Sequence, residues 1–323
     1  MKDIKKPNIP WQPKPQGYNL PIWRYDRNPI IGTNPTQNIA RIFNSSVIRY
    51  EDYFMGVFRA EQLNGMPFLY LGKSQDGISW SFEKERIQVK NPDGTEAEFK
   101  YMYDPRLIEL ENTYYIVFCT DYHGATMGLI QTSDFKNYIR LENPFLPFNR
   151  NGVLFPRKIN GMYYMLSRPS DSGHTPFGDI FVSASPDLKF WGLHRFVFGR
   201  NDLWWQNVKV GSGCNPIETD GGWLLFYHGV TGTCNGFVYS MGGAILDIND
   251  PSKVLYRCRN WLMTPQKDYE EKGFVPNVVF PCSALLEKET GKIALYYGAA
   301  DSYLGLAFTT LDEVIRYIKE NAE

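Results

Sequence analysis

The chain has 323 residues, of which 43% are hydrophobic, 15% aromatic and 21% charged. This composition is typical of a well-packed globular protein and argues against extensive disorder. The formal net charge of −1 argues against a nucleic-acid or anionic-membrane partner, because both require a basic face on the protein.

The sequence indicates neither a targeting segment nor a membrane span. Residues 1–15 carry charges without a following apolar run, so they do not resemble a secretory signal. No stretch approaches the roughly 18 apolar residues of a membrane span. The 5 cysteines are an odd number without a CxxC pair, which indicates thiols in a reducing compartment rather than disulfides or a zinc site. We therefore expect a cytoplasmic protein without a metal or a cofactor.

Short aromatic and β-branched runs, separated by Gly, Asn, Asp and Pro turns, predict an all-β fold. In chain order, five such runs have related sequences, namely residues 53–58, 114–118, 163–167, 223–227 and 293–297. Several are followed by a second strand and then by a Ser/Asp turn that leads to an aromatic residue, as in residues 74–80, 133–135 and 185–191. Residues 311–319 alone have apolar positions at helical spacing.

This repetition predicts one domain over residues 1–323, an all-β five-bladed β-propeller with a short C-terminal helix. A large β-sandwich is the alternative. If the repeated runs are the innermost strands of the blades, the residues that follow them point into one central pocket. Those residues are Arg59, Thr120 with Asp121, Arg168, His228 and the segment 298–301. Polar groups that converge in one concave site are typical of an active site.

Two carboxylates are candidates for acid catalysis. Cleavage of a glycoside usually requires a general acid together with a base or a nucleophile. Asp104 lies in the aromatic segment 101–106, where apolar surroundings favour a protonated carboxylic acid. The alternative for Asp104 is a surface Asp-Pro turn. Asp301, in a similarly aromatic segment, is a second candidate acid or a ligand of a sugar hydroxyl.

Four basic residues lie in apolar segments, namely Arg150, Arg168, Lys209 and His228. Together they would bind an anion well, because an arginine guanidinium matches phosphate oxygens bidentately. Each of them taken singly is also compatible with a surface charge or a core group whose hydrogen bonds are satisfied. Residues 209–213 lack the spacing of a P-loop.

In order and at matching spacing, several segments resemble glycoside hydrolase family 130, the β-mannoside phosphorylases, over nearly the whole chain. The segments are residues 103–106, 149–161, 167–171, 173–180, 227–230, 275–282 and 296–301. Within the family, the chain is most similar to the subgroup that acts on β-1,4-mannosyl-N-acetylglucosamine and β-1,4-mannooligosaccharides. The resemblance implies a five-bladed propeller, in agreement with the repeats.

The resemblance also implies a role for each matching residue. Asp104 corresponds to the general acid of the family, whose proton is thought to reach the glycosidic oxygen through the mannose 3-hydroxyl. Phosphate would be bound by Arg150, Arg168, Lys209, His228 and Tyr239. Mannose would be bound by Asn44, Ser45, Arg59, Tyr103, Asn151 and Asp301.

The reaction that the resemblance implies is inverting phosphorolysis of a β-1,4-mannoside, with inorganic phosphate as co-substrate and α-D-mannose 1-phosphate as product. Phosphate is an anion at neutral pH and needs no general base, so a second carboxylate is unnecessary. One alternative is a β-mannosidase of the same family, which would use a second carboxylate to activate water. The other is a non-catalytic sugar-binding propeller, which would not need the basic residues. N-acetylglucosamine, mannose and glucose are all compatible acceptors. The sequence is also compatible with a homo-oligomer.

Overall fold

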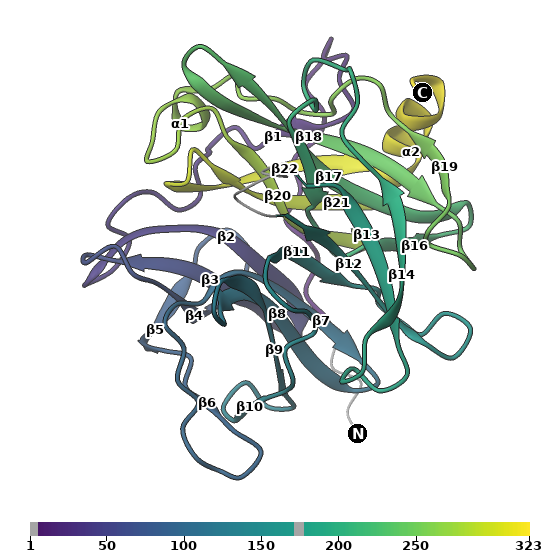
Figure 1. The fold of residues 1–323 in the computed structure, drawn as a ribbon. Helices are drawn as coiled ribbons and strands as arrows, with labels where there is room; N and C mark the ends of the chain where they lie inside the picture. Colours follow the sequence, from purple (N-terminus) through teal and green to yellow (C-terminus); the bar gives the residue numbers. More distant parts are fainter. Residues whose placement is uncertain (1–5, 171–177) are drawn as a thin grey trace.

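The computed structural model describes residues 6–170 and 178–323, and its strands form five sheets around a central axis (Figure 1). Blade I contains β2 (Ile39–Tyr50), β3 (Tyr53–Gln62), β4 (Pro67–Ser74) and β5 (Ser81–Arg86). Blade II contains β7 (Tyr103–Leu110), β8 (Thr113–Asp121), β9 (Ala125–Thr132), β10 (Tyr138–Arg140) and β6 (Val89–Lys90). Blade III contains β11 (Asn149–Leu154), β12 (Tyr163–Pro169), β13 (Ile180–Ser185) and β14 (Gly192–Phe198).

The last two blades complete the ring. Blade IV contains β15 (Lys209–Ser212), β17 (Gly222–Thr233), β18 (Gly236–Leu246) and β19 (Val254–Arg257), with β16 (Ile217–Thr219) also paired to β17. Blade V contains β20 (Val279–Glu287), β21 (Lys292–Ala299), β22 (Tyr303–Thr310) and β1 (Trp23–Arg24). The helices are α1 (Asp268–Glu271) and α2 (Leu311–Glu320). The predicted five-bladed propeller and its C-terminal helix are therefore confirmed, whereas α1 was not predicted.

Blade V joins the two ends of the chain. Trp23 of β1 pairs with Phe308 of β22 in antiparallel register, so the purple N-terminal strand lies beside the yellow C-terminal strand in Figure 1. Helix α2 follows β22 directly and buries Val314 and Ile318. None of the helices described in the structure is long and apolar enough to cross a membrane.

The repeated runs form the second strand of each blade, β3, β8, β12, β17 and β21. The innermost strands are β2, β7, β11, β15 and β20, and β2 contacts both β7 and β20 around the centre of the ring. The prediction that the repeated runs are innermost is therefore wrong. A second strand is covered on both faces by neighbouring blades, so its sequence is the more continuously apolar.

The predicted Ser/Asp turns recur after the third strand of blades I, II and III. In each turn a hydroxyl accepts a hydrogen bond from the backbone N–H three residues later, at Ser74, Thr132 and Ser185. The carboxylates two residues after them accept bonds from the following backbone N–H groups, at Asp76, Asp134 and Asp187. This is the local hydrogen bonding that makes Ser, Thr and Asp favourable in turns.

Candidate active site

A cavity of about 290 Å³ lies among the innermost strands. Eleven of the twelve residues expected at the site line this cavity, namely Asn44, Arg59, Tyr103, Asp104, Arg150, Asn151, Arg168, Lys209, His228, Tyr239 and Asp301. Ser45 is fully buried and is not among the lining residues, and its hydroxyl has no hydrogen-bond partner among the described residues.

Thr120 and Asp121 do not line the cavity, so this part of the prediction is wrong. The Thr120 hydroxyl donates to the Tyr101 carbonyl at 2.9 Å, and Asp121 forms an ion pair with Lys100 at 3.7 Å. Thr120 and Asp121 are the last two residues of β8, and the residues of this strand that line the cavity are Val117, Phe118 and Cys119.

Irregular backbone turns several site residues towards the channel. The register of β2, β7 and β11 with their neighbours shifts beside Asn44, Asp104 and Asn151, respectively. These three residues have φ angles of 43°, 53° and 55°, and Asp301 has a φ of 45°. A positive φ is unfavourable for a residue with a side chain, and such strain concentrates at functional sites. Bulges of this kind redirect a side chain out of the regular alternation of a strand.

Asp104 is held by two donors on one oxygen. Its Oδ1 accepts hydrogen bonds from Asn44 Nδ2 at 2.9 Å and from Arg59 Nη1 at 3.0 Å. Asn44 itself fits closely against β21, because a Cβ on Gly298 would lie 1.9 Å from Asn44 Oδ1. The Asp104 carboxylate therefore has a fixed orientation, with its side chain 17% exposed to the cavity.

Arg59 connects Asp104 to a second buried carboxylate. Arg59 Nη2 donates to Glu61 Oε1 at 2.8 Å, and the guanidinium lies 4.3 Å and 4.8 Å from the ring centroids of Phe43 and Tyr103. Burial opposes the charge of Arg59, but the carboxylates of Asp104, Asp301 and Glu61 outweigh it and raise the pKa of Arg59. Arg59 is therefore cationic and locked in position. Sequence reasoning did not identify Glu61.

Asp301 follows β21 and completes a group of lining residues that we call the carboxylate cluster, Arg59, Asp104 and Asp301. Burial raises the pKa of Asp301 to about 6; Arg59 opposes the shift and the nearby charge of Asp104 adds to it. Asp301 therefore changes charge close to neutral pH, unlike an exposed aspartate.

The remaining lining charges form a basic cluster, which consists of Arg150, Arg168, Lys209 and His228. Arg150 of β11 lies directly opposite Arg168 of β12 in the antiparallel register. Arg168 Nη1 donates to His228 Nε2 at 3.0 Å. A Cβ on Gly211 would lie 2.6 Å from His228 Cε1 and 2.9 Å from Arg168 Nη1, so a glycine is required beside this pair. Lys209 lies over the ring of Tyr239, 5.2 Å from its centroid.

Like charges oppose one another in this cluster. Burial, followed by Arg168 and Arg150, lowers the pKa of Lys209 to about 8. Burial also lowers the pKa of Arg168 to about 10. For His228, burial and the nearby cations Arg168, Lys209 and Arg106 place the pKa well below its usual value. His228 is therefore neutral, and because its Nε2 accepts from Arg168, its proton lies on Nδ1.

Several groups of the basic cluster lack ion-pair or hydrogen-bond partners among the described residues. In the part of the chain that the structure describes, no carboxylate lies within ion-pair distance of Arg150, Arg168 or Lys209. Within the same residues, His228 Nδ1 and Arg168 Nε are buried and lack hydrogen-bond partners. Since like charges placed across two strands are destabilising and buried donors are normally paired, this arrangement is suited to an anion.

Sequence reasoning assigned no role to several other lining residues, namely Val117, Phe118, Cys119, Met127, Gly152, Val275, Val278 and Phe280. Val275, Val278 and Phe280 lie in a segment that resembles family 130, which was the available signal. Cys119 and Met127 lie in ordinary apolar strand sequences. Residues 171–177, which also contribute to the resemblance, lie outside the described residues. Among residues 6–170 and 178–323, no group of three or more His, Cys, Asp or Glu side chains is placed to hold a metal ion.

The central pocket of this five-bladed propeller holds carboxylates beside cations, the groups that serve cleavage of a glycosidic bond and binding of an anion. A family model described as β-1,4-mannooligosaccharide phosphorylase matches residues 2–320. The chain therefore belongs to glycoside hydrolase family 130, and the resemblance identified in the sequence is confirmed.

The relatives to which the chain is most similar in this comparison are named as phosphorylases of mannosides. The chain is 50% identical over 326 aligned residues to the β-1,4-mannooligosaccharide phosphorylase of Ruminococcus albus, with 99% of this chain and 97% of the relative covered. It is 35% identical to the β-1,2-mannobiose phosphorylase of Listeria innocua, with 81% and 71% covered. A solved structure of β-1,2-mannobiose phosphorylase from Listeria innocua in complex with β-1,2-mannobiose has a TM-score of 0.82 at 27% identity, covering 93% of this chain and 99% of that chain.

Proposed function

We propose that the protein catalyses inverting phosphorolysis of β-1,4-mannosides, yielding α-D-mannose 1-phosphate and the remaining sugar. The observation that carries the proposal is the basic cluster, in which cations without described carboxylate partners share one cavity with Asp104. The β-1,4 linkage is supported by the relative of 50% identity, whereas the relative named for a β-1,2 linkage is 35% identical. β-1,4-Mannooligosaccharides and β-1,4-mannosyl-N-acetylglucosamine are the substrates to test first.

In this mechanism the basic cluster binds phosphate and directs one oxygen at the anomeric carbon. Arginine guanidiniums match two phosphate oxygens at once, and Lys209 and Tyr239 lie beside them. Positioning a nucleophile contributes about 7–11 kcal/mol towards lowering a barrier, and fixed cations stabilise charge that develops in the transition state. Because phosphate attacks from the face opposite the leaving group, a β-mannoside gives an α-phosphate.

Asp104 supplies the proton in the proposed reaction. The bond between the anomeric carbon and the glycosidic oxygen breaks as the bond to phosphate forms, and the released oxygen gains the proton. Oδ1 of Asp104 is occupied by Asn44 and Arg59, so Oδ2 is the oxygen available to carry the proton. We propose transfer through the mannose 3-hydroxyl, as the family resemblance implies, with Asp301 and Asn151 binding other hydroxyls of the sugar.

We also propose one catalytic domain over residues 1–323 in a reducing, cytoplasmic compartment. All five cysteines are free thiols, and Cys119, Cys214, Cys258 and Cys282 are buried. Free buried thiols are typical of proteins that are not exposed to an oxidising environment. A homo-oligomer stays a prediction.

The test of the reaction is incubation of the purified protein with β-1,4-mannobiose and with β-1,4-mannosyl-N-acetylglucosamine, with and without inorganic phosphate. Phosphorus and proton NMR identify the products. We expect α-mannose 1-phosphate to form only with phosphate. Free mannose released equally well without phosphate would make the protein a hydrolase, and no turnover of either sugar would favour a sugar-binding module.

A further inference from the structure

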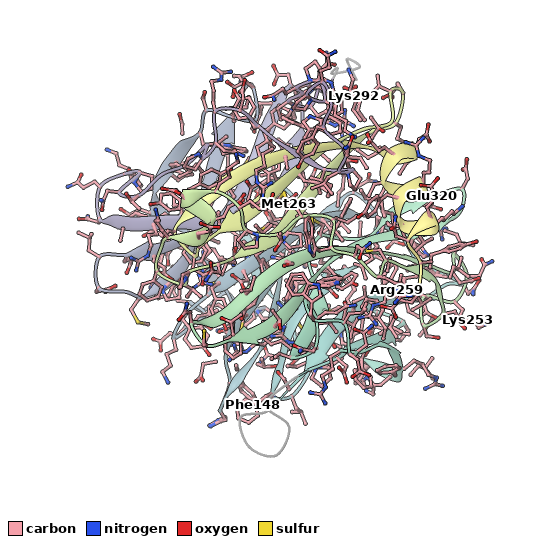
Figure 2. The ribbon with its side chains drawn as sticks, turned by 90° about the horizontal axis from the view of Figure 1, so that it is seen from above. Phe148, Lys253, Arg259, Met263, Lys292 and Glu320 are labelled. Carbon is pink, nitrogen blue, oxygen red and sulfur yellow. The ribbon has the colours of Figure 1, made fainter. Side chains whose placement is uncertain are left out.

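Residues 263–278 form a segment between blades IV and V that we call the strap. Its first residue, Met263, accepts a hydrogen bond from the backbone N–H of Met241 at 2.7 Å, and Figure 2 shows Met263 between the green strands of blade IV and the yellow strands of blade V. Near its other end, Asn277 O accepts from the backbone N–H of Tyr239 at 2.9 Å. The strap is therefore bonded to the strand that carries Tyr239 into the cavity.

The same strap is bonded to the residues that carry Asp301. The backbone N–H of Val275 donates to Ala300 O at 3.2 Å, and that of Ala300 donates to Val278 O at 3.1 Å. Gly273 packs so closely here that a Cβ on it would lie 2.3 Å from Ala300 O. Val275 and Val278 themselves line the cavity. The strap therefore spans from the phosphate-facing Tyr239 to the sugar-facing Asp301.

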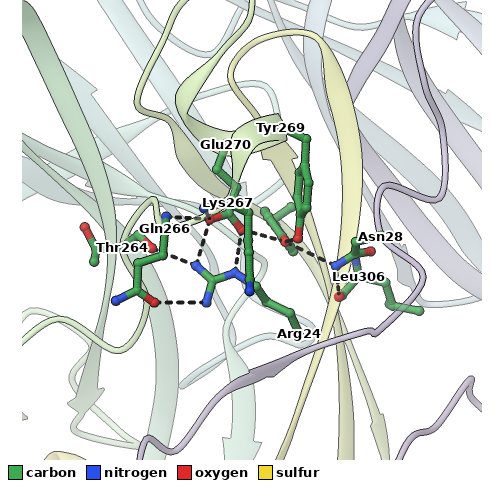
Figure 3. A network of polar contacts seen from close by, with 9 residues as sticks. Arg24, Asn28, Thr264, Gln266, Lys267, Tyr269, Glu270 and Leu306 are labelled. Carbon is green, nitrogen blue, oxygen red and sulfur yellow. Dashed lines mark hydrogen bonds and ion pairs between the residues drawn. The ribbon is translucent and has the colours of Figure 1, made fainter.

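One buried carboxylate fixes the strap from behind. Glu270 in α1 is 0% exposed, and its two oxygens accept bonds from Arg24 Nε at 2.6 Å and Arg24 Nη2 at 2.8 Å (Figure 3). The hydroxyl of Tyr297 donates to the same carboxylate at 2.9 Å, as do the backbone N–H groups of Gln266 at 2.8 Å and Lys267 at 3.2 Å. The main-chain carbonyl of Glu270 accepts from Val278 N at 3.0 Å.

The partner of this carboxylate comes from the other end of the chain. Arg24 lies on β1, the strand that completes blade V, and its Nη2 also donates to Thr264 O at 2.7 Å. A bidentate pair that is largely buried has a narrow range of acceptable geometries, which makes it suited to fixing a position rather than to adding stability.

We propose that Glu270, together with Arg24, is a positioning residue that holds the strap so that Tyr239 and Asp301 stand at the separation required for phosphate and mannoside to react. The inference rests on the proposed function of the cavity. Neither Glu270 nor Arg24 lines the cavity, so their effect passes through Val275, Val278 and the backbone bonds to Tyr239 and Ala300.

The test compares Glu270→Gln with Asp268→Asn, which removes an exposed carboxylate from the same helix, one that pairs with Lys272 at the surface. Because a displacement of about 1 Å can cost about a hundredfold in rate, we expect kcat/KM of Glu270→Gln to fall by about ten- to a hundredfold. Both KM values, for phosphate and for mannoside, should rise in Glu270→Gln and stay unchanged in Asp268→Asn. A purely structural role would lower only the active fraction and hence the apparent kcat. Unchanged KM values in the folded variant would overturn the proposal.

A second variant and a hydrogen-exchange measurement test the same role of Glu270. Arg24→Lys keeps the buried charge but cannot form both bonds, so we expect the same rise in both KM values. This variant replaces Glu270→Gln in the test if Glu270→Gln fails to fold. Hydrogen exchange of the Tyr239 and Ala300 amides, which bond to the strap, needs no substrate. We expect faster exchange in the Glu270 variant than in Asp268→Asn. If the wild type has no phosphate-dependent activity, the proposed function fails and exchange alone decides, with unaltered exchange overturning the role of Glu270.

Discussion

Replacing Lys209 with methionine should stabilise the protein while it removes phosphate binding. Methionine has a similar length and retains the apolar contacts of the lysine stem, but it removes one positive charge from the basic cluster. In the absence of an anion, that charge is repelled by Arg168 and Arg150 and is partly desolvated. Stability gained at the expense of function is common for residues that serve a binding site.

The size of the effect follows from the pKa of Lys209, which falls from 10.5 to about 8 in the folded protein. At about 1.4 kcal/mol for each pH unit, keeping Lys209 charged at pH 7 costs the folded state about 3 kcal/mol. Since the side chain is partly exposed to solvent, screening reduces this cost, and we expect a gain of about 1–3 kcal/mol.

The pKa of Lys209 also predicts how the stability difference between the wild type and Lys209→Met changes with pH. Because the folded pKa lies below the unfolded one, the unfolded chain binds more protons between about pH 8 and about pH 10.5. The stability of the wild type should therefore rise relative to Lys209→Met across this interval, and the advantage of the variant should disappear at its upper end.

Urea unfolding at pH 7 in phosphate-free buffer measures this difference, with the exposed Lys136→Met as the control. Titration with phosphate should then stabilise the wild type and Lys136→Met, by about 2.7 kcal/mol at a hundred times the dissociation constant, and leave Lys209→Met unchanged. A Lys209→Met protein that is less stable than the wild type, yet still stabilised by phosphate, would refute the reasoning.

Three other predictions concern catalysis. Asp104→Asn should lower kcat by about 10²–10⁴-fold, because it removes the general acid, and leave mannoside binding measured by calorimetry largely intact; near-normal turnover would exclude Asp104 as the acid. Arg168→Ala should lower kcat/KM for phosphate by about 10²–10³-fold while the affinity for mannoside changes little, and steady-state kinetics with an unaltered phosphate dependence would contradict the assigned role. With pH, kcat/KM for mannoside should decline below about 6 as Asp301 gains a proton, and kcat/KM for phosphate should decline above about 8 as Lys209 loses one; profiles that stay flat across both values would show that neither group governs binding.

Local sequence patterns predicted the second strands and missed the innermost ones. The buried run of β3 from Phe54 to Phe58 has no polar interruption, so it is recognisable as a strand. β2 is equally buried at its centre, but Asn44, Ser45 and Ser46 occupy that stretch. The bulge at Asn44 also breaks the alternation of sides on which a periodicity argument depends. A strand that lines a polar channel therefore lacks the pattern by which strands are recognised.

The resemblance found most of the lining residues, but the relations among them required the structure. That Arg150 and Arg168 stand opposite each other depends on the register of β11 and β12, which a bulge shifts. Glu61 is a lone carboxylate in an apolar strand and Glu270 is one of three in α1. Their roles follow from Arg59 and from Arg24, which is 246 residues from Glu270. Interactions between residues so far apart in the sequence produce no local motif from which they could be predicted.

The basic cluster favours phosphate over water as the nucleophile. An inverting hydrolase activates water with a general base, commonly a carboxylate. Of the two lining carboxylates, Asp104 is bonded to Asn44 and Arg59, which leaves Asp301, with a pKa of about 6, as the carboxylate that such a mechanism would have to use. Within the basic cluster, His228 is neutral with its accepting nitrogen occupied by Arg168, and Lys209 is mostly protonated at pH 7. Neither His228 nor Lys209 is therefore free to accept a proton from water, whereas a phosphate anion needs no base and neutralises the charges that bind it.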